Sequence, residues 1–313
     1  MRVLITGANG FVGRHLLKEL YKNNNESILA VRNVSDSYWL EQFGSIVLLN
    51  ILDEDNVYKT IINYKPQVII HLAAISNVGY SWGNPKETFE TNVIGSLNIM
   101  KAIIKSKLDI KLINIGSSEE YGLTAKKKEI LNELDTCLPQ NPYAISKLSS
   151  SSLLIQLAKK HGINLIHARP FNHFGPGQNV GFVVSDFAYQ IAEIKKGNKK
   201  PIISVGNLNA KRDFTDVRDV VNAYLLIINK DMETGIYNIC SGTARKISSI
   251  VDELILLSGV EIDIKIDKNK YRPLEVESFM GSSAKIKEAT SWNLSYNFTD
   301  SLRDTLTWWE EKI

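Results

Sequence analysis

The 313-residue sequence predicts an α/β fold, a doubly wound parallel sheet followed by a smaller C-terminal lobe. Two observations support this prediction. Short, continuously hydrophobic segments alternate with segments of helical periodicity up to about residue 170, which is typical of a parallel sheet covered on both faces. The first hydrophobic segment also leads into a turn with glycines at positions 7, 10 and 13.

The predicted elements follow one another along the chain. We expect strands at 2–6, 27–32, 45–50, 67–72, 110–115 and 164–169, and helices at 15–21, 54–64, 85–107 and 142–161. Asp53 is the expected N-cap of the helix at 54–64. We expect residues 1–170 to form a Rossmann domain, with later strands returning to it from about 201–240. Residues 171–313 are expected to form mainly a second lobe, packed closely enough on the first to leave one cleft.

The glycine turn has the context of a phosphate cradle. Gly7 permits the tight turn, Gly10 lets the backbone approach a pyrophosphate, and Gly13 lets the next helix pack close to the strand. Phosphates then lie on the amides at the helix N-terminus. A glycine triplet alone is a weak signal, since an ordinary strand-to-helix turn explains it equally well. The dinucleotide interpretation therefore depends on motifs elsewhere.

Composition excludes several classes of protein. The net charge is only +3, and no basic stripe interleaved with aromatic residues suggests a nucleic-acid surface. The longest apolar runs, such as 68–74, are too short to span a membrane. Cys137 and Cys240 lack metal-ligand spacing, as do the histidines, and so few cysteines suit a reducing compartment. The chain enters its first strand at once, so we expect no signal peptide and a cytoplasmic protein without a metal.

Arg32 bears on the choice of dinucleotide. It ends the second predicted strand, roughly 20 residues after Gly13, where an acid usually hydrogen-bonds the adenosine ribose. Arg32-Asn33 offers no acid, and an arginine suits a 2′-phosphate. We therefore favour NADP(H), while NAD(H) stays possible. The simpler alternative is an exposed arginine at a strand end.

Tyr143 and Lys147 are four residues apart on a predicted helix, so they lie on one face. The ammonium of Lys147 is expected to lower the pKa of the Tyr143 phenol, and an oxidised nicotinamide would act in the same direction. Ser117 follows the fifth strand and faces the same cleft, where its hydroxyl can hydrogen-bond a substrate carbonyl. Leu72-Ala-Ala74 supplies small residues where a cofactor passes close to the backbone. Each match alone is common by chance.

In combination, T-G-x-x-G-x-x-G, H-L-A-A, S-S and Y-x-x-x-K resemble the extended short-chain dehydrogenases/reductases that act on nucleotide sugars. The segments 169–178, 205–219 and 272–276 make the chain similar to GDP-mannose 4,6-dehydratases. It is still more similar to the reductases that convert GDP-6-deoxy-4-keto-D-mannose to GDP-D-rhamnose. The resemblance covers essentially the whole chain. It implies a homodimer in which the helices at 85–107 and 142–161 pair across a two-fold axis.

The resemblance also implies a role for particular residues. The catalytic residues would be Ser117, Glu119, Tyr143 and Lys147. The cofactor-binding residues would be Gly7, Gly10, Phe11, Val12, Gly13, Arg32, Asn50, Ile51, Leu72, Ala73, Ala74, Tyr143 and Lys147. The substrate-binding residues would be Ser118, Asn172, Arg212, Arg272 and Glu275. Forked guanidinium groups suit a pyrophosphate and a carboxylate suits ribose hydroxyls, which agrees with this last set.

The expected reaction is NAD(P)H-dependent reduction of the C4 keto group of a GDP-4-keto-6-deoxyhexose, giving GDP-D-rhamnose or its C4 epimer. Glu119 keeps a GDP-mannose 4,6-dehydratase as the alternative, because that family uses a glutamate two residues after its catalytic Thr/Ser. Two features favour the reductase: the residues between the glycines of the turn, Ala8-Asn9 and Phe11-Val12, and a length of 313 residues, which is short for a dehydratase. A nucleotide-sugar epimerase is a further alternative, but such enzymes usually have an acid in place of Arg32. A non-catalytic dinucleotide sensor is another, but such proteins typically lack the tyrosine or the lysine, and both Tyr143 and Lys147 are present here. Guanine as the base rests on the resemblance alone.

Overall fold

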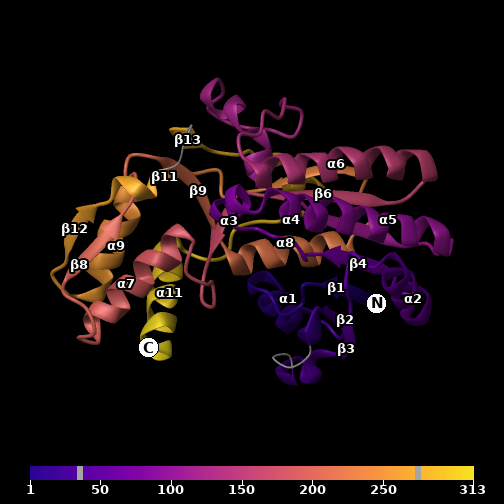
Figure 1. Ribbon diagram of the computed structural model, residues 1–313, viewed down its shortest axis with the longest axis horizontal. Helices are drawn as coiled ribbons and strands as arrows, with labels where there is room; N and C mark the ends of the chain where they lie inside the picture. The colour runs from indigo at the N-terminus through magenta and orange to yellow at the C-terminus, as the bar shows by residue number, and fades with distance from the viewer. Residues whose placement is uncertain (34–37, 272–275) are drawn as a thin grey trace.

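The computed structural model describes residues 1–33, 38–271 and 276–313 (Figure 1). A parallel sheet covered by helices on both faces makes up one part of the molecule, and much of the chain after residue 170 forms a second region beside it. Arg272 and Glu275, assigned above to the substrate, lie outside the described residues.

Seven strands of the described chain form the main sheet, and all neighbouring pairs in it are parallel. Their spatial order is β10-β6-β5-β4-β1-β2-β3. The strands are β1 (Arg2–Thr6), β2 (Glu26–Val31), β3 (Ser45–Leu48), β4 (Val68–His71), β5 (Lys111–Ile115), β6 (Leu165–Pro170) and β10 (Gly235–Ile239). The first six are the predicted strands, with ends shifted by at most two residues. The order reverses between β1 and β4, so a ligand crevice is expected at the carboxyl ends of these two strands.

Alternating side chains of the strands contact different helical layers. Val3 and Ile5 pack in one core with α1 and α8, whereas Leu4 packs in the other with α2, α5 and α6. The helices of the two layers are α1 (Phe11–Lys22), α8 (Val217–Asn229), α2 (Glu54–Tyr64), α5 (Gly95–Ser106) and α6 (Pro142–His161). Asp53 caps α2 as predicted, because its carboxylate accepts a hydrogen bond from the Asn56 amide at 2.9 Å.

The single helix predicted at 85–107 is wrong in detail. The structure has α3 (Val78–Gly83), α4 (Pro85–Phe89), a π-helical turn η2 (Glu90–Ile94) and then α5. Asn92 in the π turn is buried and holds the loop after β4: it accepts from the Ile75 amide at 2.8 Å and donates to the Ile75 carbonyl at 3.0 Å. It also donates to the Ser146 hydroxyl on α6 at 2.9 Å. These contacts link the widened turn to the neighbouring loop and helix.

The described part of the second region contains two small sheets and three helices that pack on them. In one sheet, β9 (Lys211–Asp216) pairs with β11 (Ala244–Lys246), β13 (Ser278–Phe279) and β7 (Asn172–Phe174). The other pairs β8 (Ile202–Val205) with β12 (Asp263–Ile266). The third hydrophobic core lies among α7 (Val183–Lys195), α9 (Ile247–Ser258) and α11 (Phe298–Lys312).

The remaining short elements connect these layers. They are α10 (Ala284–Thr290) and the 3₁₀ turns η1 (Tyr38–Phe43), η3 (Ser118–Tyr121), η4 (Leu123–Lys126) and η5 (Lys268–Lys270). Of these, η3 follows β5 directly and holds the Ser117 segment.

Candidate active site

The glycine turn between β1 and α1 packs against the segment after β4. Gly7 has φ +69°, and a Cβ there would lie 2.9 Å from the Ala73 amide nitrogen. A Cβ on Gly13 would lie 2.4 Å from the Ala8 carbonyl oxygen, so only glycine lets α1 start this close to β1. Ala73 also donates its amide to the Thr6 hydroxyl at 3.2 Å. The structure therefore brings the two predicted cofactor segments, 7–13 and 72–74, into direct contact.

Phe11 and Val12 occupy the first turn of α1, where both are half-buried. The Phe11 ring stacks on the imidazole of His173 with an interplanar angle of 4°. The glycine turn thus contacts the strand that begins at Asn172.

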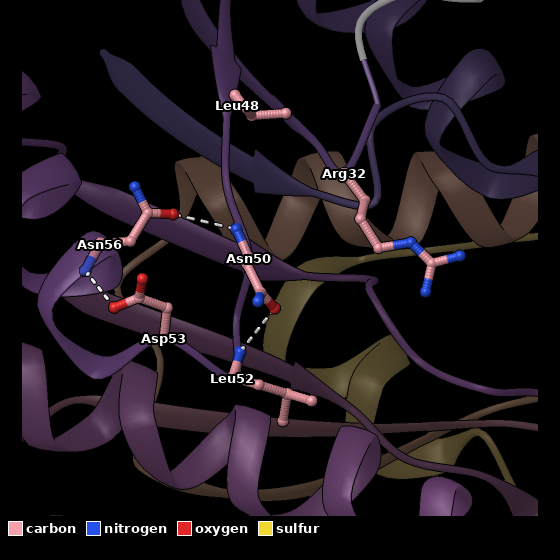
Figure 2. A pocket seen from close by; sticks show the side chains of 6 residues that line it. All are labelled: Arg32, Leu48, Asn50, Leu52, Asp53 and Asn56. Atoms are coloured by element: carbon pink, nitrogen blue, oxygen red, sulfur yellow. Dashed lines mark hydrogen bonds between the residues drawn. The ribbon is translucent and has the colours of Figure 1, made fainter.

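A cavity of about 560 Å³ opens beyond β2 and β3, and Arg32, Leu48, Asn50, Leu52, Asp53 and Asn56 line it (Figure 2). The Asn50 amide donates to Asn56 Oδ1 at 2.9 Å, and Asn50 Oδ1 accepts from the Leu52 amide at 3.1 Å. Arg32 lines the cavity from the end of β2, and its side chain is exposed (Figure 2). Arg32 and Asn50 therefore meet in one cavity, whereas the Ile51 side chain packs in the core.

Tyr143 and Lys147 lie at the start of α6. Asn141 caps this helix by accepting from the Ala144 amide at 2.8 Å, and Pro142 occupies its first turn. Both side chains are buried, with 8% of Tyr143 and 7% of Lys147 exposed. The Ser117 side chain lies within hydrogen-bonding range of the Tyr143 phenol and acts to lower its pKa. Lys147 Nζ instead donates to the Ile115 carbonyl at the end of β5, at 2.7 Å.

Burial controls the protonation of both groups. It raises the pKa of Tyr143 well above its usual value; the hydrogen bond from Ser117 opposes this rise, and the charges of Glu119 and Glu120 add to it. Burial lowers the pKa of Lys147 to about 8, with the charge of Glu120 opposing. The expectation that Tyr143 has a lowered pKa is therefore wrong here, because desolvation dominates and Lys147 is directed at a backbone carbonyl.

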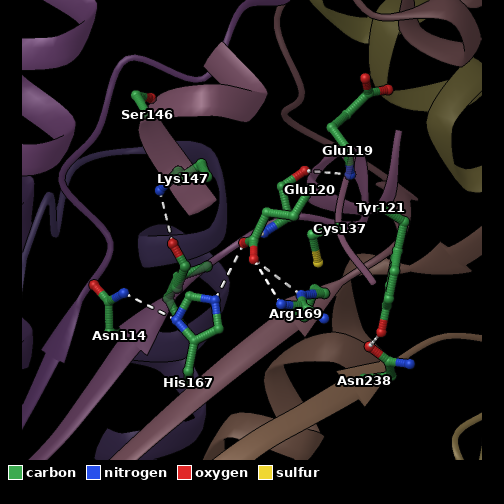
Figure 3. Close-up of polar contacts among 12 residues, drawn as sticks. Asn114, Glu119, Glu120, Tyr121, Cys137, Ser146, Lys147, His167, Arg169 and Asn238 are labelled. Carbon is green, nitrogen blue, oxygen red and sulfur yellow. Dashed lines mark hydrogen bonds and ion pairs between the residues drawn. The ribbon is translucent and has the colours of Figure 1, made fainter. Parts of the chain in front are cut away.

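Glu119 is hydrogen-bonded to Ser117 through its backbone amide and to Asn141 through its carboxylate. Its amide donates to the Ser117 hydroxyl at 3.2 Å, and its Oε2 accepts from Asn141 Nδ2 at 3.0 Å. In Figure 3 its carboxylate points away from Lys147 and His167. Glu119 is thus joined to the N-cap of the helix that bears Tyr143.

The sequence interpretation missed a buried polar cluster of Asn114, Glu120, His167 and Arg169 (Figure 3), which contacts the Ser117 backbone through Glu120. Glu120 accepts hydrogen bonds from Arg169 Nη2 at 2.8 Å and from His167 Nε2 at 3.1 Å, and Asn114 Nδ2 lies 3.0 Å from His167 Nδ1. All four residues are buried. A histidine and an arginine in the otherwise hydrophobic segment 165–169 were the available signal, because charged side chains in a buried strand require partners.

The predicted substrate residues that the structure describes are divided between two places. Ser118 is buried in η3 next to Ser117. Asn172 pairs with Phe214, two residues from Arg212 along β9, so Asn172 and Arg212 share a face of the small sheet. Arg212 donates to the Lys211 carbonyl at 2.8 Å, and its guanidinium carbon lies 5.4 Å from the centre of the Phe279 ring.

No cluster of three or more His, Cys, Asp or Glu side chains in the described ranges could hold a metal ion. None of the helices in these ranges is long and apolar enough to cross a membrane.

Comparison with known proteins gives matches over the whole chain. The family model described as GDP-mannose 4,6 dehydratase matches residues 4–305. The GDP-6-deoxy-D-mannose reductase of Pseudomonas aeruginosa is 32% identical over 312 residues, covering 100% of this chain and 98% of the relative. The GDP-6-deoxy-D-talose 4-dehydrogenase of Aggregatibacter actinomycetemcomitans is 27% identical over 293 residues, covering 91% and 90%. The solved structure of RMD from Pseudomonas aeruginosa complexed with NADPH has a TM-score of 0.87 and 33% identity, covering 100% and 99%.

Proposed function

This chain belongs to the GDP-mannose 4,6-dehydratase family, and we propose that it is an NADPH-dependent reductase of the C4 keto group of a GDP-4-keto-6-deoxyhexose. The observation that carries the proposal is the pairing of the Ser117 hydroxyl with a Tyr143 phenol that burial keeps protonated. A carbonyl reduction needs this arrangement, a hydrogen-bond donor for the oxygen and an acid that delivers a proton to it. The match to a reductase over both full chains supports the same substrate class.

The residues present fit a dinucleotide cofactor. Small residues at the contact between the glycine turn and segment 72–74 leave the backbone accessible to a pyrophosphate, and the N-terminus of α1 supplies amides for it. The cavity at Arg32 is large enough for an adenosine, and the guanidinium that lines it suits a 2′-phosphate. When bound, the reduced nicotinamide supplies the hydride.

In the proposed mechanism, Ser117 donates a hydrogen bond to the C4 carbonyl oxygen and polarises it. As hydride reaches C4, negative charge develops on that oxygen, and Tyr143 gives it the phenolic proton. Positioned acids of this kind contribute about 10²–10⁴-fold to rate. Lys147, as an ammonium, would bind the hydroxyls of the cofactor ribose. Asn172, Arg212 and Arg272 would hold the diphosphate of the substrate, and Glu275 would accept hydrogen bonds from its ribose hydroxyls.

Glu119 favours a second candidate function, dehydration of GDP-mannose. Elimination across C5 and C6 needs a base besides Tyr143, and the Glu119 carboxylate lies near enough to Tyr143 to raise its pKa. Its hydrogen bond with Asn141 supports the first candidate, because that contact turns the carboxylate toward the helix N-cap.

One experiment separates the two functions. Protein, NADPH and GDP-4-keto-6-deoxymannose are mixed, and absorbance of the reduced nicotinamide is followed, with Tyr143→Phe as the matched control. The reductase predicts consumption of NADPH by wild type and at least about 10²-fold slower consumption by the variant. No consumption, together with conversion of GDP-mannose to a 4-keto product without added reductant, would refute the reductase and support the dehydratase.

We also propose a homodimer built on the helices around α6. Four large apolar side chains on neighbouring elements are exposed: Tyr80 and Trp82 on α3, Phe89 on α4 and Ile145 on α6. Exposed apolar side chains on neighbouring elements are typical of protein interfaces. Light scattering after gel filtration would give twice the chain mass for a dimer.

Both cysteines are free, which supports our further proposal of a cytoplasmic setting.

A further inference from the structure

Glu120 is a fully buried carboxylate that contacts the Ser117 backbone, and the mechanism above does not use it. None of its side chain is exposed. A carboxylate in such a place ordinarily takes up a proton, because burial disfavours the charged form. Burial does act to raise the pKa of Glu120, but the interactions with His167 and Arg169 outweigh it and lower the pKa to about 2. The interactions with His167 and Arg169 therefore favour the ionised form of Glu120.

The hydrogen bonds of Glu120 require an anion with two accepting oxygens. Oε1 accepts from the Ser117 backbone amide at 2.9 Å and from His167 Nε2 at 3.1 Å. Oε2 accepts from Arg169 Nε at 3.0 Å and from Arg169 Nη2 at 2.8 Å. All four partner atoms are donors, two for each carboxylate oxygen. A glutamine at position 120 would replace one of these oxygens by an NH₂ group, and in either orientation that NH₂ group would face two donors and accept neither hydrogen bond.

The surroundings leave the cluster little freedom. The guanidinium carbon of Arg169 lies 4.6 Å from the centre of the Tyr121 ring. A Cβ on Gly116 would come within 2.4 Å of Glu120 Oε1 and 2.3 Å of His167 Nε2, so the glycine before Ser117 provides the space for this hydrogen bond. Glu120 also completes a capping box with Ser117 across η3. The cluster is thus anchored to the backbone of Ser117, whose hydroxyl lies beside the Tyr143 phenol.

We propose that Glu120 is a positioning residue of the active site: held by His167 and Arg169, its carboxylate fixes the Ser117 backbone so that the serine hydroxyl stays aimed at the reacting carbonyl. The inference rests on the proposed reduction, because it assigns Ser117 to the carbonyl oxygen. Glu120 itself touches neither the phenol nor the substrate. Its effect on catalysis passes through Ser117, and this separates it from a residue that only stabilises the fold.

The direct test is a double-mutant cycle between Glu120→Gln and Ser117→Ala. If Glu120 acts through Ser117, E120Q lowers kcat by about tenfold to 10²-fold in the wild-type background and has little further effect when the serine hydroxyl is absent. An equal loss in both backgrounds would overturn the proposal. Asp219→Asn is the control, since this buried carboxylate accepts from the Ser295 and Tyr296 amides away from the site and should show no coupling with S117A.

A second pair of variants keeps the test decisive if E120Q does not fold. A glutamine at 167 places its amide nitrogen near the position of His167 Nε2, whereas an asparagine is too short to reach Glu120. His167→Asn should therefore lower kcat about tenfold and His167→Gln should restore it, again only when the Ser117 hydroxyl is present. Equal activity of the two variants would overturn the proposal.

One readout does not depend on the reaction. The Ser117 amide should exchange its hydrogen faster in H167N than in H167Q, measured by mass spectrometry on peptides covering 115–121. Unchanged exchange would contradict the inference even if the proposed substrate is wrong. An inactive wild type would instead count against the proposed function.

Discussion

The buried ammonium of Lys147 predicts an unusual alkaline limit for the reaction. Burial lowers the pKa of Lys147 to about 8, while an exposed lysine has a pKa near 10.4. Two titratable groups interact with it: Glu120 raises the pKa of Lys147, and His71 is itself held neutral, with a pKa of about 3. The protonated fraction of Lys147 therefore falls from about nine tenths at pH 7 to about one tenth at pH 9.

The direction of the pH dependence follows from the protonation state of Lys147 that the mechanism needs. The mechanism uses the ammonium, so activity is present below pH 8 and is lost as pH rises through the pKa. We expect kcat/KM for the keto sugar to fall about tenfold per pH unit above pH 8, measured at saturating NADPH. Tyr143 does not set this limit, because burial raises its pKa.

The matched variant is Lys147→Arg, which keeps the positive charge but does not deprotonate in this range. Its activity will be lower, because a guanidinium fits the lysine site poorly, yet its profile should stay flat where wild type declines. A wild-type profile that is flat to pH 10, or the same decline in K147R, would refute the assignment of the limit to Lys147.

Three further predictions concern other parts of the site. Arg32→Ser should raise KM for NADPH about 10- to 100-fold with little change for NADH, because hydrogen bonds to a charged group contribute about 1.5–3 kcal/mol; equal changes for both cofactors would contradict the role of Arg32. Gly13→Ala should lower the free energy of unfolding by about 1–3 kcal/mol in urea denaturation, because its Cβ would lie 2.4 Å from the Ala8 carbonyl oxygen; Gly83→Ala, with open space around it, is the control, and an equal effect of the two would refute the reasoning. Glu119→Gln should leave reduction within about threefold of wild type, because reduction needs only one acid, and a loss of 10²-fold or more would assign Glu119 to the chemistry.

Local patterns in the sequence were sufficient for six of the seven described strands of the main sheet. Hydrophobic runs located the first six strands, and an aspartate before a helical segment located the N-cap of α2. The helix-period rule also placed Tyr143 and Lys147 on one helix. These features depend on neighbours within a few residues, so a single sequence contains them.

Contacts between distant segments were not predicted from these patterns. The Glu120 cluster joins residues 114, 120, 167 and 169, and only the packing of β5 against β6 makes them neighbours. The π turn at η2 likewise depends on Asn92 reaching Ile75 and Ser146. The direction of the Tyr143 pKa was wrong for the same reason. Charge at fixed spacing is visible in a sequence, whereas desolvation depends on the whole fold.

The measurement that tests the central claim most directly is the destination of the hydride. Protein is incubated with GDP-4-keto-6-deoxymannose and NADPH deuterated at the transferring position of the nicotinamide, and the product sugar is analysed by NMR. A C4 reductase places deuterium at C4 of a GDP-6-deoxyhexose, in proportion to the NADPH consumed. Unlabelled product, or conversion of GDP-mannose to a 4-keto sugar while the deuterated cofactor remains intact, would contradict the account.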